Sequence, residues 1–185
     1  MTPVGGKKKE VISKNTAAKG SAAYGATAET AAAKLKFVKC TISENVSTAA
    51  STGTIHTAQS ASKSPAEAVV INTLFEKNIA NGGNAVYTTG AFDLDDCRFV
   101  QNGKLVETVY TGADVLADNS LTFSRSIDGC TFDKKKAVAI GAANINTIKL
   151  AETKENTYDL ELIEKPVLKE TQVQFTGEKI EFASL

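Results

Sequence analysis

The residues best suited to chemistry are three aspartates, Asp93, Asp95 and Asp128. Asp93 and Asp95 alternate with Phe92 and Leu94, so in a strand both carboxylates share the outward face. Alignment of the repeats in this chain places Asp128 over Asp95. Carboxylates stacked in this way could hold a cation or form the acid–base pair of a glycosidase. The sequence favours a solvated edge instead, because an aromatic cleft and a basic excess are missing.

The remaining reactive side chains form no recognisable catalytic or metal motif. The single histidine, His56, lies in a Thr-rich run without a serine, aspartate or cysteine at a telling spacing, so we expect an ordinary surface or strand histidine. Cys40, Cys97 and Cys130 are too few for a disulfide framework and lack zinc-ligand spacing, and we expect buried free thiols. The sequence therefore predicts no catalytic residue, no cofactor and no metal.

Composition narrows the class of protein. The chain has 185 residues, and its 21 Lys and Arg are balanced by 21 Asp and Glu. Nucleic-acid binders and anionic-membrane binders need a basic excess, so neither partner is expected. No apolar stretch approaches the roughly 20 residues of a membrane-spanning helix, and no apolar signal-peptide core comes after the first lysines. We expect either a protein that stays in the cell or a piece of an exported protein.

A recurring pattern must position these aspartates and thiols. An apolar residue is followed by a small or thiol residue, a large apolar residue and finally asparagine, at fixed offsets. Two complete copies occupy 70–78 and 94–102, and a looser copy includes Ile148 and Leu150. The large apolar position falls at 42, 75, 99, 132 and 150. Because these intervals are unequal, the pattern favours a β-solenoid, whose loops can change length, over a helical repeat.

Each copy is followed by a second β-prone run, at 53–57, 84–88, 107–111 and 137–141. Such units bury their apolar faces only by stacking, so we predict an all-β fold, a parallel β-helix with coils about 4.8 Å apart. We expect an interior apolar stack, a stack of thiols with Thr73, and an asparagine ladder at a bend. The ladder residues are Cys40, Ile42, Asn45, Phe75, Asn78, Cys97, Phe99, Asn102, Cys130 and Phe132.

The two ends differ from the repeats. Residues 1–34 are rich in Ala and Lys and poor in large apolar side chains, which predicts a disordered linker or a cap, with a short helix at 27–35. The repeat domain is expected to span 35–185. Its last part, 158–185, alternates charged and apolar residues, which predicts either the last coils or a C-terminal hairpin cap.

The pairing of FxxN with a GGA-type motif resembles the repeat of the chlamydial polymorphic membrane proteins. The matching residues are Phe75, Asn78, Gly82, Gly83, Ala85, Val86, Tyr87, Phe99 and Asn102. The match covers 35–141, although Asn84 interrupts the GGA motif and later copies lose the asparagine. The resemblance implies a right-handed β-helix, an autotransporter passenger and adhesion to host cells. The segment after residue 141 is too short for a translocator barrel, so the resemblance implies a passenger fragment.

The main functional hypothesis is a non-enzymatic β-helical protein of the cell surface or extracellular space, with an adhesive or scaffolding role. Its expected partner is a protein receptor on another cell, or a second copy through the solenoid ends. One alternative is a polysaccharide-active β-helix that uses Asp93, Asp95 and Asp128. Another is a structural subunit whose open ends stack into filaments. A complete chain without a signal peptide would instead be cytoplasmic.

Overall fold

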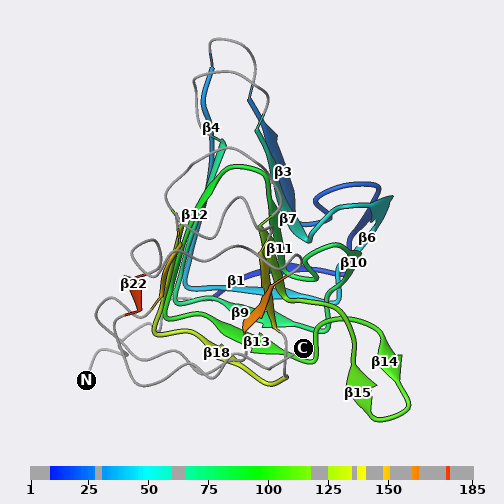
Figure 1. The fold of residues 1–185 in the computed structure, drawn as a ribbon. Coiled ribbons are helices and arrows are strands. Elements are labelled where there is room, and N and C mark those ends of the chain that lie inside the picture. Colours follow the sequence, from blue (N-terminus) through cyan, green and yellow to red (C-terminus); the bar gives the residue numbers. More distant parts are fainter. Residues whose placement is uncertain are drawn as a thin grey trace, which may run out of the picture.

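The computed structural model describes residues 9–27, 31–59, 66–117, 125–134 and 137–140, and the backbone of three further strands at 148–150, 160–162 and 174–175. All the regular secondary structure in these ranges is β-strand, and the described residues contain no helix. The chain winds through the same sequence of strand directions several times, and successive coils lie one over another (Figure 1).

The first four coils supply most of the strands. The first contains β1 (Glu10–Ser13), β2 (Thr16–Ala17), β3 (Ala23–Ala26) and β4 (Ala33–Val38). The second contains β5 (Cys40–Ser43), β6 (Val46–Ala50), β7 (Ile55–Ala58) and β8 (Ala66–Ile71). The third contains β9 (Leu74–Glu76), β10 (Ile79–Asn81), β11 (Val86–Thr88) and β12 (Ala91–Asp95). The fourth contains β13 (Arg98–Val100), β14 (Leu105–Val106), β15 (Val109–Tyr110), β16 (Val115–Ala117) and β17 (Arg125–Asp128).

Later strands continue the pattern with β18 (Thr131–Phe132), β19 (Val138–Ile140), β20 (Ile148–Leu150), β21 (Leu160–Leu162) and β22 (Gln174–Phe175). Parallel pairing between coils builds four walls. The first wall is β1-β5-β9-β13-β18, and the short wall is β2-β6-β10. The second wall is β3-β7-β11-β16-β19-β21, and the third wall is β4-β8-β12-β17-β20-β22. The predicted parallel β-solenoid is therefore confirmed.

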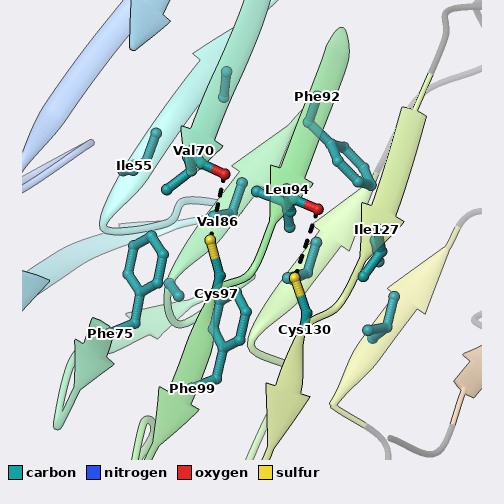
Figure 2. Packing of buried hydrophobic residues seen from close by; sticks show 14 of the residues in the cluster. Ile55, Val70, Phe75, Val86, Phe92, Leu94, Cys97, Phe99, Ile127 and Cys130 are labelled. Carbon is teal, nitrogen blue, oxygen red and sulfur yellow. Dashed lines mark hydrogen bonds between the residues drawn. The ribbon is translucent and has the colours of Figure 1, made fainter. Parts of the chain in front are cut away.

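The interior of the first wall is a column of equivalent apolar residues. Ile42, Phe75, Phe99 and Phe132 occupy the same register position on consecutive strands. The Phe99 ring lies parallel to its neighbours, with centroid distances of 5.0 Å to Phe75 and 4.3 Å to Phe132. Figure 2 shows the rings of Phe75 and Phe99 beside the cysteines of the next column. Phe75 and Phe99 are fully buried, so the predicted apolar stack is confirmed.

The second predicted column also forms. Cys40, Thr73, Cys97 and Cys130 lie at or just before the start of a first-wall strand and are buried. Two thiols donate hydrogen bonds to carbonyl oxygens of the preceding coils, Cys97 to Val70 at 3.3 Å and Cys130 to Leu94 at 3.6 Å (Figure 2). The thiols therefore fill the corner between the third wall and the first wall, and all three are free.

The asparagine ladder lies at the other end of the first wall. The backbone N–H and the side-chain amide of Asn45 both donate to Oδ1 of Asn78, at 3.1 and 3.0 Å. Asn78 makes the same two bonds to Oδ1 of Asn102, both at 3.0 Å. Asn15 adds an unpredicted rung by donating in the same way to Asn45. Each amide thus satisfies several polar groups at a buried bend, which is why asparagine recurs there.

Both ends of the first wall turn through one residue in left-handed backbone conformation. Before the wall these residues are Lys39, Asn72, Asp96 and Gly129, with φ between 48° and 62°. After the wall they are Lys14, Glu44, Lys77 and Gln101, with φ between 54° and 60°. Residues other than glycine pay a steric cost in this left-handed region, because their Cβ atom approaches the following carbonyl oxygen. Backbone hydrogen bonds to the next coil, such as that from Asn72 N to Asp95 O at 2.8 Å, offset this cost.

Over the described residues, 1–34 forms strands and not the expected linker or short helix. β1, β2 and β3 lie within this segment, and β4 begins at Ala33, so the described coils begin before residue 35 and no helix forms at 31–35. The reason is coil-to-coil pairing: β1 matches β5 over four residues and β3 matches β7 over four. Small side chains suffice here because the neighbouring strand supplies the hydrogen-bond partners. Residues 28–30, within the expected helix, lie outside the described residues.

Two later assignments also need correction. Residues 107–111 do not form the fourth strand of the second wall, which is β16 at 115–117, paired with β11. They form the turn and second strand of an antiparallel hairpin, β14–β15. In addition, Leu150 pairs with Ile127 on the third wall and not with Phe132. Both errors arise because short apolar runs look alike, whereas hydrogen-bond register distinguishes them.

Residues 158–185 were expected to form either the last coils or a C-terminal hairpin cap, and their described strands belong to further coils. β21 pairs in parallel with β19, and β22 pairs in parallel with β20. These strands therefore extend the second and third walls as further coils. They do not form an antiparallel hairpin with each other. The rest of 158–185 lies outside the described residues.

Candidate functional site: the acidic edge and the projecting hairpin

The structure brings the three predicted aspartates onto one outward face of the third wall. Asp95 pairs directly with Asp128 on the adjacent strand, as the repeat alignment predicts. Asp93 pairs with Ser126, whose hydroxyl donates a hydrogen bond to Asp93 Oδ1. Phe92 is 2% exposed, which confirms that its neighbours Asp93 and Asp95 point away from the core.

This acidic edge does not converge on a point. The described residues include no group of three or more His, Cys, Asp or Glu side chains arranged to hold a metal ion. A shallow pocket of about 80 Å³ lies at the start of the first wall. Lys9, Asp96 and Arg98 line it together with Asn72, Thr73 and Leu74, and Asp93, Asp95 and Asp128 do not. The edge is a strip of carboxylates along a flat face.

Sequence reasoning missed the hairpin β14–β15. In the first three coils, the first-wall strand is followed by a short-wall strand, β2, β6 or β10. In the fourth coil, the hairpin follows β13 and takes the place of that short-wall strand. Figure 1 shows the hairpin projecting from the body of the solenoid. Its large side chains are exposed: Leu105 by 57%, Val106 by 55% and Val109 by 61%.

Two hydrogen bonds and a glycine turn anchor the hairpin at its base. The backbone N–H of Thr111 donates to Lys104 O at 2.9 Å, and the amide of Asn84 donates to Thr111 O at 3.0 Å. Gly103 has a φ of 100°, and a Cβ atom there would collide with Thr111 O. Glycine is therefore required for the first wall to lead into the hairpin. Asn84, which interrupts the GGA motif, is the residue that ties the hairpin to the third coil.

A buried ion pair lies behind the hairpin. Lys134 Nζ is 2.9 Å from Asp114 Oδ1, and the two side chains are 6% and 0% exposed. Lys134 Nζ also donates to the carbonyl of Asn102, the last described rung of the asparagine ladder, at 2.7 Å. Burial raises the pKa of Asp114 to about 7, although the ammonium of Lys134 opposes this shift. The ammonium of Lys134 therefore has two roles: it caps the last described rung of the ladder at Asn102, and it supplies the counter-charge of Asp114.

His56 lies on β7, so it is a strand histidine as the sequence predicts, but it is not a surface residue. It is 3% exposed on the outward side of the second wall, because its ring lies between Tyr24 and Tyr87 at centroid distances of 5.0 and 4.7 Å. Thr52 Oγ1 lies 3.1 Å from its Nδ1. Burial, with a smaller contribution from Lys19, lowers the pKa of His56 to about 4. The ring is therefore neutral at pH 7 and acts as a packing residue.

Searches with the chain against protein-family models, curated proteins and solved structures found no match. Within the described ranges, no helix is long and apolar enough to cross a bilayer. The local geometry thus provides the basis for a functional proposal, and two features stand out on the surface. One is the projecting apolar hairpin, and the other is the charged outward face of the third wall.

Proposed function

We propose that this chain is a non-enzymatic β-helical surface protein of adhesin type, which binds a protein on another cell through the hairpin β14–β15. The observation that carries the proposal is the exposure of Leu105, Val106 and Val109 on one projecting element. Exposed apolar side chains gathered on one element are costly in water and commonly mark protein contacts, and here Val106 and Val109 share one face of the hairpin. The resemblance of 35–141 to the repeats of the chlamydial polymorphic membrane proteins supports the same role.

The anchoring of the hairpin also favours a contact role. A pre-organised hairpin loses little conformational entropy when a partner covers it, which favours affinity. Its two strands are the only members of their sheet among the described residues, so an extended segment of the partner could add to an edge by backbone hydrogen bonding. The partner chemistry that fits is an apolar patch beside an exposed strand edge on a protein.

Binding of the fluorescently labelled chain to cultured epithelial cells, with and without prior protease treatment of the cells, tests the proposal. The triple variant Leu105→Thr/Val106→Thr/Val109→Thr places β-branched residues throughout the hairpin but removes its apolar surface. We expect protease-sensitive binding by the original chain and about tenfold weaker binding by the variant, since a few central contact residues carry most of the binding energy of an interface.

Val11→Thr is the matched control. Val11 is 61% exposed, as Val109 is, but lies on β1 of the first wall. The control should bind cells as the original chain does. Equal binding by the triple variant would overturn the proposal, as would binding that survives protease treatment of the cells. Cleavage of a polysaccharide panel that is lost in Asp95→Asn would support the enzymatic alternative.

A further inference from the structure

The outward face of the third wall has an ordered distribution of charge. On β4 the outward positions are Lys34, Lys36 and Val38; on β8 they are Glu67, Val69 and Ile71. On β12 they are Ala91, Asp93 and Asp95, in register with those of β8. The register therefore creates three rows that run across the coils, and the middle row is Lys36, Val69 and Asp93.

Positive charge gathers on the first coil and negative charge on the third. Lys34 is already paired, because its Nζ lies 2.7 Å from Glu67 Oε2. Lys36 and Asp93 are two strands apart, about 10 Å by strand spacing, which is too far for an ion pair within one copy. The corner residues continue the trend, with Lys39 on the first coil and Asp96 on the third.

Apolar side chains separate the two charged zones. Val69 is 8% exposed, Val38 is 42% exposed, and Ile71 lies between Val38 and Asp95 in the same row. An apolar centre with a charged rim is the usual anatomy of a protein interface. Here the two sides of the rim have opposite sign, so the rows of Lys36 and Lys39 are complementary to themselves when the face is turned around. In the outer row Glu67 meets Glu67, and each is already neutralised by its own Lys34.

We propose that two copies of this chain associate face to face through their third walls, related by a two-fold axis parallel to β8. This operation places β4 of one copy opposite β12 of the other and β8 opposite β8. Lys36 of each copy then faces Asp93 of its partner, Lys39 faces Asp96, and the two Val69 side chains meet near the axis. Such an isologous arrangement closes as a dimer and does not extend into a filament.

The association should be weak and sensitive to salt. Three strands of this length present a face on the order of 15 by 20 Å, or roughly 600 Å² over the two copies, which is below the range of stable specific interfaces and fits a weak, transient contact. Ion pairs at a rim mainly set orientation and specificity, and salt screens them. The dimer is independent of the hairpin contact proposed for cell binding, because the hairpin leaves the chain beside the short wall and not on the third wall.

Exchange of charges between Lys36 and Asp93 provides the sharpest test. Lys36→Glu in both copies places a new carboxylate opposite Asp93, and Asp93→Lys places two ammonium groups together, so each single variant should dimerise at least about tenfold more weakly. A mixture of the two variants brings the new carboxylate of one opposite the new ammonium of the other, and Lys36 opposite Asp93. The mixture should therefore recover dimers that contain one copy of each, at the affinity of the original chain.

Sedimentation at several protein concentrations and native mass spectrometry, in 50 mM and 500 mM salt, give the readout. Circular dichroism first establishes that each variant is folded, which is expected because both positions face outward. Lys104→Glu, a charge reversal beside the hairpin, is the matched control and should dimerise normally. The triple hairpin variant should dimerise normally too, so failure of the hairpin proposal and failure of this one are distinguishable.

Three results would overturn the proposal. One is an original chain that stays monomeric at millimolar concentration in 50 mM salt. Another is a dimer whose affinity is unchanged in Lys36→Glu or Asp93→Lys. The third is a mixture of these variants that forms no mixed dimer. Larger species that grow with concentration would indicate end-to-end stacking of solenoids instead and would also count against a closed dimer.

Discussion

Two corners of the solenoid meet the same requirement in different ways. At the ladder corner, where the first wall leads into the short wall, Asn15, Asn45, Asn78 and Asn102 pass hydrogen bonds from coil to coil. In the fourth coil the ladder still includes Asn102, but a hairpin replaces the short-wall strand, and the buried pair of Asp114 and Lys134 lies at the hairpin corner, where the hairpin returns to the second wall. Repetition satisfies buried polar groups with neutral amides, whereas an interruption requires charge.

The two solutions differ in cost. A neutral amide that makes all its hydrogen bonds is inexpensive to bury, but two charges lose much of their hydration energy on burial. The pair lies beside the hairpin, so the coil that carries the projecting element also carries the more costly buried charges. Stability measurements on variants of each corner test this difference in cost.

The largest effect is expected in the apolar column of the first wall, which runs past both corners. Phe99 is 1% exposed and stacked between two other rings, so Phe99→Asp would bury a charge without a partner. The cost exceeds roughly 5 kcal/mol, and the chain should lose its strand signal in circular dichroism. Asp93→Ala, on the outward face, should keep that signal. Native strand content in Phe99→Asp would refute the stacking model.

Loss of Lys134 should destabilise the hairpin corner strongly at neutral pH. Lys134→Met leaves Asp114 buried without its cation, and breaking a buried pair in this way costs about 3–5 kcal/mol. The cost should shrink in acid, because a protonated Asp114 needs no counter-charge. Urea unfolding at pH 5 and pH 7.5 measures both values. An equal loss of stability at the two pH values would show that the charge of Asp114 is not the cause.

The ladder corner should respond according to position. Asn78 bonds to rungs on both sides, and Asn78→Ala should cost about 2–4 kcal/mol because several buried groups lose partners. Asn15 is an exposed end rung, so Asn15→Ala should cost less than about 1 kcal/mol. Urea unfolding of both variants gives the comparison. Similar losses at the two positions would mean that the amides act singly and not as a ladder.

The smallest net effect in the original chain concerns pH, because Asp114 and His56 contribute opposite trends. The pKa of Asp114 is raised to about 7 in the folded chain, so this carboxyl makes the protein less stable as pH rises from about 4 to 7. The pKa of His56 is lowered to about 4, so this ring makes it more stable as pH rises from about 4 to 6.5. The two trends oppose each other in the original chain.

Single substitutions should reveal each trend. His56→Gln leaves the contribution of Asp114, and its unfolding free energy should decline more, or rise less, between pH 4 and 6.5 than that of the original chain. Asp114→Asn leaves the contribution of His56 and should shift the dependence in the opposite direction. Denaturant unfolding at several pH values gives the slopes. Parallel pH profiles for both variants would contradict the assignment of these two groups.

Sequence reasoning found the positions that repetition marks. Large apolar residues and asparagines at constant offsets identified Phe75, Phe99, Asn78 and their equivalents. Ile12 and Asn15 share the offset of Ile42 and Asn45, and this signal could have found the first coil within 1–34. It was obscured because the surrounding residues are Ala and Lys, and because Glu10 takes the place of a thiol.

Positions fixed by contacts between distant residues could not be found in this way. The run at 107–111 has the same β-forming character as 84–88, but only backbone register shows that it leaves the wall. The approach of Lys134 to Asp114 depends on the path of the fourth coil, which no local pattern encodes. The burial of His56 depends on tyrosines from the coils on either side.

The unequal intervals of the repeat arise at two edges of the molecule: the hairpin lengthens the fourth coil at the short wall, and the crossing from the second to the third wall also varies in length. Between the second and third walls the chain crosses at 27–32, 59–65, 89–90 and 118–124, and the short crossing at 89–90 belongs to the coil that separates Phe75 from Phe99. Length can change there without altering the register of any wall, because loop closure costs little extra free energy per added residue. As a scaffold, the solenoid therefore offers one site per coil for peptide insertion, spaced about 4.8 Å apart along a single edge.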